Sequence, residues 1–177
     1  TNIDDNLPLL AIRGFGQNDD QMVPLHMAMV AATVANDGAM MKPYVVDTTI
    51  DNEGRVLSQT QPEVWKRPIS RETAGILREL MRGVAERGTA SCCIALENGI
   101  SVAAKTGTLN FVSSLAGYVQ VPDGPPRAFA IFLADADSRA RAIAEAEEVP
   151  DGARPWGRTA RALQNRLLLH WATHPDG

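Results

Sequence analysis

The sequence has little that could cross-link it or hold a metal ion. Its 177 residues include two cysteines, the neighbours Cys92 and Cys93, and adjacent cysteines cannot close a loop of useful size. We therefore expect two small apolar side chains here and no disulfide framework. His26, His170 and His174 lie far from the cysteines, and the chain has no Cys-x-x-Cys pair, so the sequence predicts no zinc site.

An excess of charge and a long apolar run are also lacking. The chain carries 17 Lys and Arg against 21 Asp and Glu, a net charge of −4, and its scattered basic residues predict neither a nucleic-acid footprint nor a polybasic membrane patch. No apolar run approaches the roughly 18 to 20 residues that span a bilayer. The polar opening at residues 1–5 lacks the features of a signal peptide, and without a Met it is what we expect of a processed chain or an excised piece.

The composition that remains, 45% hydrophobic and 21% charged, is typical of one soluble globular domain. The first half predicts two helices around a β-hairpin. One helix begins at Pro24 without a capping hydroxyl before it and ends at residues 36–38; the hairpin occupies residues 42–69, with its turn at 51–54. The second helix starts after the N-cap Ser70 and ends at Gly88. Its expected buried stripe comprises Ile76, Leu77, Leu80, Met81 and Val84.

The second half predicts an antiparallel meander followed by helices. Strand-like runs cover residues 100–104, 115–121 and 128–134, with short links between them. A short charged helix is expected over 138–148, and a longer one closes the chain. The stripe predicted for this last helix comprises Trp156, Ala160, Leu163, Leu167 and Trp171. We interpret the three tryptophans, including Trp65, as packing residues and not as a ligand platform.

The sharpest chemical feature is Lys105-Thr106-Gly107-Thr108, which follows an apolar strand. Residues 99–106 almost fit the phosphate-binding pattern G-x-x-x-x-G-K-[ST], but Ala104 stands where the second glycine belongs. That glycine supplies close approach to phosphate, whereas the residues before Lys105 favour extended backbone. The sequence therefore disfavours nucleotide binding.

A second interpretation places these four residues on an edge strand that faces a cleft. Lys105 would supply positive charge, and the hydroxyls of Thr106 and Thr108 could grip a carboxylate. Gly107 would let a substrate backbone lie alongside the strand, and the following N–H could point at a developing oxyanion. Taken alone, the motif fits an ordinary strand end with an exposed lysine equally well.

Further spaced motifs decide between these interpretations. The chain resembles the penicillin-recognising serine acyl-transferases, which include penicillin-binding proteins and class A β-lactamases and carry a Lys-Thr-Gly element. The segments that resemble penicillin-binding transpeptidase domains are Gly14-Phe15-Gly16-Gln17, Pro24-Leu25-His26-Met27-Ala28, Ala35-Asn36-Asp37-Gly38, Lys42-Pro43, Arg87-Gly88-Thr89-Ala90 and Ala104-Lys105-Thr106-Gly107-Thr108. Residues 107–110 and 113–119 look more like class C D-alanyl-D-alanine carboxypeptidases, and Leu115-Ala116 replaces an aromatic residue common in class B enzymes. His26 is expected to be a helix residue without a catalytic role.

The resemblance implies an α/β (α+β) fold of the penicillin-binding transpeptidase or β-lactamase type, with a five-stranded antiparallel sheet flanked by helices. It implies an active-site serine that is acylated by the D-Ala-D-Ala end of a peptidoglycan stem peptide or by a β-lactam. Lys105 and Thr106 would join the polar network around that serine, Gly107 would give clearance, and Thr108 would donate its N–H to the oxyanion. No metal or organic cofactor is implied. Such enzymes act outside the cytoplasmic membrane and are held there by an upstream anchor.

Two elements of the family pattern are missing from this chain. The nucleophile normally lies in Ser-x-x-Lys and a second motif in Ser-x-Asn, yet none of the seven serines has Lys three residues later or Asn two residues later. We therefore expect residues 1–177 to be the C-terminal half of a transpeptidase domain, whose serine comes from an N-terminal half on the same or another chain. The alternative is a degenerate homologue that binds muropeptide or a partner protein. Asn110 could line the cleft rim as a substrate-binding residue, or serve only as a turn residue.

Overall fold

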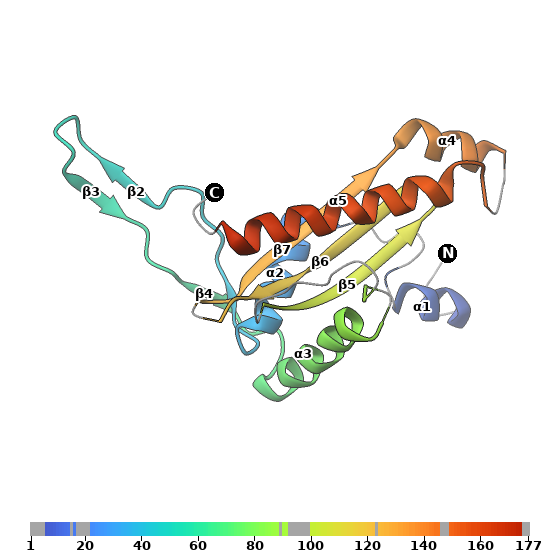
Figure 1. The fold of residues 1–177 in the computed structure, drawn as a ribbon. Coiled ribbons are helices and arrows are strands. Elements are labelled where there is room, and N and C mark those ends of the chain that lie inside the picture. The colour runs from blue at the N-terminus through green and yellow to red at the C-terminus, as the bar shows by residue number, and fades with distance from the viewer. Residues whose placement is uncertain are drawn as a thin grey trace.

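The computed structural model describes residues 6–174 except residues 15, 17–21, 89, 92–99, 123 and 146–148. The described residues form a main sheet of three strands with helices on both faces, and an extended arm (Figure 1). Its elements are α1 (Leu7–Gly14), α2 (Pro24–Ala35), β1 (Met40–Met41), β2 (Thr48–Ile50), β3 (Val56–Gln59), β4 (Val64–Lys66), α3 (Arg71–Glu86), β5 (Ser101–Leu109), β6 (Val112–Gln120), β7 (Arg127–Ala134), α4 (Ala136–Ala144) and α5 (Ala153–Thr173). The mixed α/β class that the sequence predicts is confirmed.

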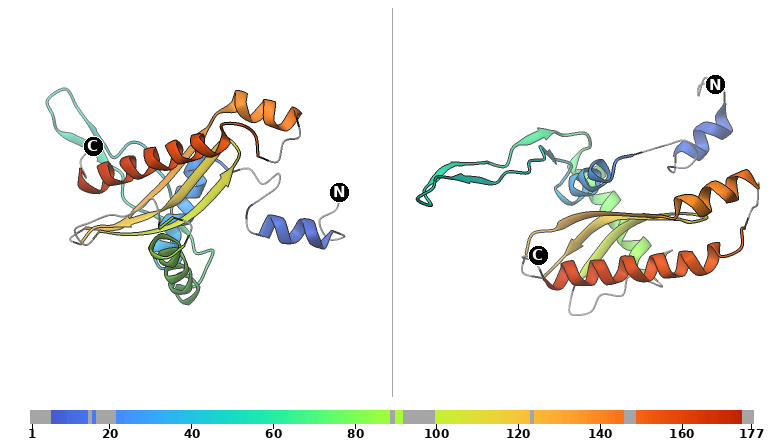
Figure 2. Two further views of the ribbon diagram at one scale, coloured as in Figure 1. Left: turned by 45° about the vertical axis from the view of Figure 1, so that its right-hand side comes forward. Right: turned by 90° about the horizontal axis from the view of Figure 1, so that it is seen from above.

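The main sheet is the predicted antiparallel meander, in the order β5-β6-β7. Helices α2 and α3 cover one face of the sheet, and α5 crosses the other (Figure 2). Strands β5 and β6 extend beyond their predicted apolar runs, because residues 105–109 and 112–114, most of them polar or glycine, continue the ladder. This extension carries Lys105–Thr108 into the body of a strand.

The core lies on both sides of this sheet because side chains alternate along each strand. On the α5 side, Val102, Leu115 and Ile131 pack with Leu168 of α5. On the opposite side, the smaller cluster joins strand residues to the two other helices; it comprises Ala103, Tyr118, Val34, Leu77 and Met81. The middle strand β6 is therefore buried on both faces, whereas β5 and β7 each have one neighbour among the described strands.

Helix α3 starts where the sequence predicts, since the Ser70 hydroxyl accepts a hydrogen bond from Thr73 N at 3.0 Å. The predicted buried stripe is partly wrong. Ile76 and Leu80 are 58% and 63% exposed, because the helix turns a neighbouring face, with Ala74 and Leu77, toward the body. Leu77, Met81 and Val84 do pack against the core.

Helix α5 also differs from its predicted stripe. Leu163 and Trp171 are 44% and 42% exposed. The buried positions carry mostly small residues, which let the helix backbone approach the sheet closely; they are Ala153, Gly157, Ala160, Gln164, Leu168 and Ala172. Trp156 packs edge-on against Phe111, with ring centroids 6.2 Å apart, so its interpretation as a packing residue is confirmed.

The predicted hairpin is an arm that projects from the body (Figure 1). Strands β2 and β3 pair around the turn at 51–54, where Asp51 Oδ1 accepts from the backbone N–H groups of Glu53 and Arg55. Residues 44–46 of the predicted hairpin lie outside β2, and a second strand pair, β1 with β4, closes the base of the arm. Trp65 is 56% exposed with the Lys66 ammonium 4.3 Å from its ring, so its interpretation as a packing residue is wrong.

Helix α1 was not predicted from the sequence, although two local signals mark its start. The Asn6 side chain accepts from Leu9 N at 3.0 Å, and Pro8 lies in the first turn. The short charged helix is confirmed as α4, which the Asp135 carboxylate caps through Ser138 N. Predictions that concern Phe15, Gln17, Thr89 and the cysteine pair lie outside the described residues.

Gly117 of β6 has no room for a side chain. A Cβ at this position would contact the backbone carbonyl oxygen of Ala103 on β5. We predict that Gly117→Ala lowers the free energy of unfolding by about 3 kcal/mol, because backbone cannot move aside cheaply. Gly75→Ala in α3 is the control, since its nearest atom lies 3.9 Å away, and it should be neutral or raise that free energy by about 0.5–1 kcal/mol. Equal effects in chemical denaturation would contradict this packing.

Asp37, at the C-terminal end of α2, joins α2 to α3 through two arginines. Its carboxylate lies 2.6 Å from Arg78 Nη1 and 3.3 Å from Arg71 Nη1. The hydrogen bond from Arg78 is the largest cause that lowers the pKa of Asp37, with the charge of Arg71 adding to it. Because its folded-state pKa is lowered, the Asp37 carboxylate stabilises the fold at pH values above the ordinary pKa of Asp. This stabilisation is lost as the pH falls through the folded-state pKa.

We therefore predict a pH-dependent effect of Asp37→Asn. At pH 7 the variant should unfold at a lower temperature than the parent chain, and the difference should shrink as the pH falls below the ordinary pKa of Asp and through the lowered pKa of Asp37, because the carboxylate then becomes neutral. Asn tolerates the positive φ of 50° at this position as well as Asp does. A difference in melting temperature that stays constant from pH 7 to pH 3 would contradict a role for the carboxylate charge.

Candidate functional site

The Lys105–Thr108 motif lies in the second half of β5. Residues 101–109 form one continuous strand, with neither a loop nor a helix after Lys105. A phosphate-binding loop needs both of these features, so the nucleotide-binding interpretation is excluded by the backbone. Within the described strands β5 is an edge of the sheet, as the cleft interpretation expects.

A two-residue turn sets which backbone groups of the motif point outward. Asn110 and Phe111 connect the pair Leu109–Val112, and a pair that flanks so short a turn exchanges its own hydrogen bonds. Because hydrogen-bonded pairs alternate along an antiparallel ladder, Gly107–Ser114 is also such a pair. The N–H and C=O groups of Thr106 and Thr108 are therefore directed away from β6, toward the edge of the sheet.

Lys105 brings its positive charge to the same edge. Its side chain is exposed, and the ammonium donates to the carbonyl oxygen of Thr106 at 2.7 Å. Strand alternation places Lys105 and Gly107 on the α2 and α3 side of the sheet and Thr106 and Thr108 on the α5 side. An ammonium, a backbone N–H and two hydroxyls thus lie within four consecutive residues of one edge strand.

Gly107 has a neighbour that the sequence analysis did not anticipate. Ser114, its partner on β6, donates its hydroxyl to the Gly107 carbonyl oxygen at 3.2 Å. A Cβ on residue 107 would come to 2.5 Å from Ser114 Oγ. The missing side chain therefore makes room for a contact within the sheet, whereas the expected clearance for a substrate remains a prediction.

Asn110, predicted to line a cleft rim, lies in the turn directly after β5. Its carbonyl oxygen accepts a hydrogen bond from Arg139 Nη1 of α4 at 3.4 Å, and the next residue, Phe111, has a positive φ of 58°. This placement fits the alternative interpretation of a turn residue. A contact of Asn110 with substrate remains a prediction.

A buried polar pair supports the strand behind the motif. Ser113 Oγ donates to Gln164 Oε1 at 3.1 Å, and Gln164 Nε2 donates to the Ser113 carbonyl at 3.3 Å. Both residues are at least 96% buried, so each polar atom needs the other. The pair fixes β6 to α5 on the side of the sheet opposite Ser114.

The remaining candidate groups have structural roles or lie elsewhere. His26 is exposed on α2. Burial raises the pKa of Tyr118, so its phenol stays protonated at neutral pH. Among the residues that the structure describes, no three His, Cys, Asp or Glu side chains gather as a metal site, and no helix is long and apolar enough to cross a membrane.

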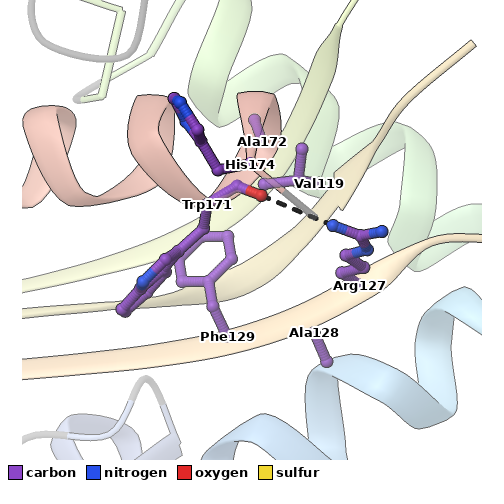
Figure 3. Close-up of a pocket in the computed structure, with 7 residues that line it drawn as sticks. All are labelled: Val119, Arg127, Ala128, Phe129, Trp171, Ala172 and His174. Carbon is purple, nitrogen blue, oxygen red and sulfur yellow. Dashed lines mark hydrogen bonds between the residues drawn. The ribbon is translucent and has the colours of Figure 1, made fainter. Parts of the chain in front are cut away.

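A pocket of about 240 Å³ lies at the opposite end of the sheet (Figure 3). Val119, Arg127 and Trp171 line it, and Arg127 Nη1 donates to the Trp171 carbonyl at 3.5 Å. Val119 pairs with Val102 of β5, three residues before Lys105, which is about 10 Å along a strand. The pocket is therefore separate from the motif.

Comparison with known proteins shows which family the chain resembles. The family model described as the penicillin binding protein transpeptidase domain matches residues 8–150. Peptidoglycan D,D-transpeptidase PbpA of Mycolicibacterium smegmatis is 32% identical over 154 residues, covering 87% of this chain and 29% of that protein. A D-alanyl-D-alanine carboxypeptidase of an Actinomadura species is 33% identical over 144 residues, covering 70% and 24%.

Solved structures agree. The crystal structure of PBPA from Mycobacterium tuberculosis superposes with a TM-score of 0.62 at 25% identity, covering 90% of this chain and 38% of that chain. The imipenem acyl-enzyme complex of the same protein gives 0.59 at 27% identity, covering 89% and 34%. The chain spans less than a third of the curated relatives it matches. With its family model matched over residues 8–150, the chain belongs to the penicillin-binding protein transpeptidase family.

Proposed function

We propose that this chain supplies the Lys-Thr-Gly strand of a serine D,D-acyl transferase that acts on the D-Ala-D-Ala ends of peptidoglycan stem peptides. The observation that carries the proposal is the placement of Lys105–Thr108 on an edge strand, with the Lys105 ammonium at the strand edge. Membership of the transpeptidase family supports it. Relatives named as a D,D-transpeptidase and a D-alanyl-D-alanine carboxypeptidase leave the acceptor, an amine or water, open.

The nucleophile in this proposal comes from sequence outside residues 1–177. The chain contains no Ser-x-x-Lys, and it covers only 29% of the PbpA relative. Residues 1–177 would then be the C-terminal part of the domain, and an N-terminal part, on the same or another chain, would bring the serine to the edge of β5. The site would act outside the cytoplasmic membrane, as peptidoglycan chemistry requires.

The proposed reaction is acyl transfer through a serine ester. The serine oxygen attacks the carbonyl carbon of the penultimate D-Ala and loses its proton to a neighbouring base. The peptide C–N bond then breaks, and the terminal D-Ala leaves after it has gained a proton. An amine or a water molecule next attacks the ester and releases the serine. No step requires a metal or an organic cofactor.

Each residue of the motif has a role in this scheme. The Lys105 ammonium and the Thr106 hydroxyl would stabilise charge around the nucleophile and the terminal carboxylate of the substrate. The Thr108 N–H, directed away from β6, would donate to the oxyanion that forms on the attacked carbonyl. The Thr108 hydroxyl and the Asn110 side chain would contact the carboxylate side of the substrate. β-Lactams would acylate the same serine, and the related penicillin-binding protein A from M. tuberculosis forms an acyl-enzyme complex with penicillin G.

We predict that residues 1–177 alone form no covalent adduct with a fluorescent penicillin, whereas the intact protein labels on a serine outside this range. In the intact protein, Lys105→Ala should slow acylation by roughly 100-fold, because the ammonium no longer stabilises the developing charge. The control is Lys42→Ala, which removes another exposed lysine, paired with Glu63 at 3.4 Å at the base of the arm; it should leave the rate unchanged.

Intact-mass measurement and peptide mapping decide this proposal. A label that maps within residues 1–177 would refute the external nucleophile. An unlabelled intact protein that binds muropeptide reversibly in calorimetry would instead support the degenerate binding homologue. Equal acylation rates of Lys105→Ala and the parent protein would refute the role of the motif.

A further inference from the structure

We propose that Ser114 is a positioning residue that holds the Thr108 N–H at the edge of β5. The inference deepens the proposed function and rests on it, since it concerns the same oxyanion donor. Ser114 lies on β6 and forms no part of the Lys-Thr-Gly motif. Its hydroxyl acts through the Gly107 carbonyl, to which it donates at 3.2 Å.

The rigid peptide unit between Gly107 and Thr108 transmits this contact. The Gly107 carbonyl and the Thr108 N–H belong to one planar trans peptide, in which they point in opposite directions. A bond that holds the carbonyl toward β6 therefore holds the N–H toward the edge. A carbonyl oxygen accepts two hydrogen bonds, so it can accept from both the backbone N–H and the hydroxyl of Ser114.

The contact matters because β5 is supported on one side only among the described strands. A peptide group in a middle strand is held by hydrogen bonds to strands on both sides. The peptide group between Gly107 and Thr108 is held by one neighbouring strand, so it can rotate about the axis of β5. The Ser114 hydroxyl adds a second bond from the supported side. Donors that are already aimed at the developing charge need no reorganisation during the reaction. Rotation of the peptide group would turn the Thr108 N–H away from the oxyanion and slow acylation.

Gly107 and Ser114 act as a pair in this arrangement. A Cβ on residue 107 would lie 2.5 Å from Ser114 Oγ, too close for the hydroxyl to keep its place. Any larger residue at position 107 would therefore displace the Ser114 hydroxyl and would also occupy space beside the edge strand. The requirement for glycine in the motif then has a source inside the protein, in addition to any clearance for substrate.

The test measures acylation of the intact protein by a fluorescent penicillin and separates the non-covalent dissociation constant from the first-order acylation rate. Ser114→Ala should lower the acylation rate about 2- to 12-fold, the effect of one hydrogen bond, and change the dissociation constant less than about twofold. Ser114→Thr keeps the hydroxyl and should restore most of the rate. A purely structural role would not confine the loss to the acylation step.

The adjacent Ser113 offers a matched control. Ser113→Ala removes a hydroxyl from the same strand, but that hydroxyl bonds Gln164 on the other face. It should lower the melting temperature and leave the acylation rate unchanged. Equal acylation rates for Ser114→Ala and the parent protein, or equal losses in the two variants, would overturn the proposal for Ser114 and leave the proposed function standing.

A double-mutant cycle supplies a readout that does not depend on the reaction. Gly107→Ala should lower the melting temperature of the intact protein more when residue 114 is Ser than when it is Ala, because only the serine hydroxyl is displaced. Additive effects would overturn the pairing. An intact parent protein that forms no adduct would refute the proposed function and, with it, the positioning role.

Discussion

The site depends on the register of β5 against β6. A slip of one residue would move Lys105 to the α5 face and turn the Thr108 N–H toward β6. The turn that sets this register contains no glycine, and Phe111 adopts a positive φ of 58°, at a cost of about 1–2 kcal/mol. Burial of the Phe111 ring among Ala142, Ala153 and Trp156 offsets this cost, because a fully buried aromatic side chain contributes about 2–3 kcal/mol. Packing by α4 and α5 thus sets the register of the edge strand.

Hydrogen bonds hold the middle strand β6 on both of its faces. On the α5 face, Ser113 and Gln164 form a closed pair of buried hydrogen bonds, which cannot shift without leaving polar atoms unpaired. On the other face, the Ser114 hydroxyl reaches the Gly107 carbonyl. Two neighbouring serines of one strand therefore make different contacts, since strand alternation directs Ser113 into the core and Ser114 toward the motif.

The sequence predicts the elements better than the faces that they bury. The meander and the Ser70 cap follow from local patterns and are confirmed, and β5, which carries Lys105, is an edge strand among the strands that the structure describes. The prediction that Leu80 and Leu163 are buried is wrong, because α3 and α5 each carry several adjacent apolar stripes. Which stripe is buried depends on how the helix packs against the sheet. The pairing of Ser114 with Gly107 follows from counting residues outward from the two-residue turn, but no Asn-Gly or Gly-rich signal marks that turn in the sequence. No segment of the sequence carries the Ser-x-x-Lys pattern of the family.

An edge strand is ordinarily a liability, because its outward N–H and C=O groups can pair with any extended chain. In the proposed function, the same property of β5 would give an extended peptide a place to add alongside Thr108. The Lys105 ammonium donates to the Thr106 carbonyl at this edge, and in the proposed function its charge would oppose nonspecific pairing and attract a peptide that ends in a carboxylate. In the proposed function, part of the selectivity for a short, carboxylate-ended peptide would therefore come from the strand itself.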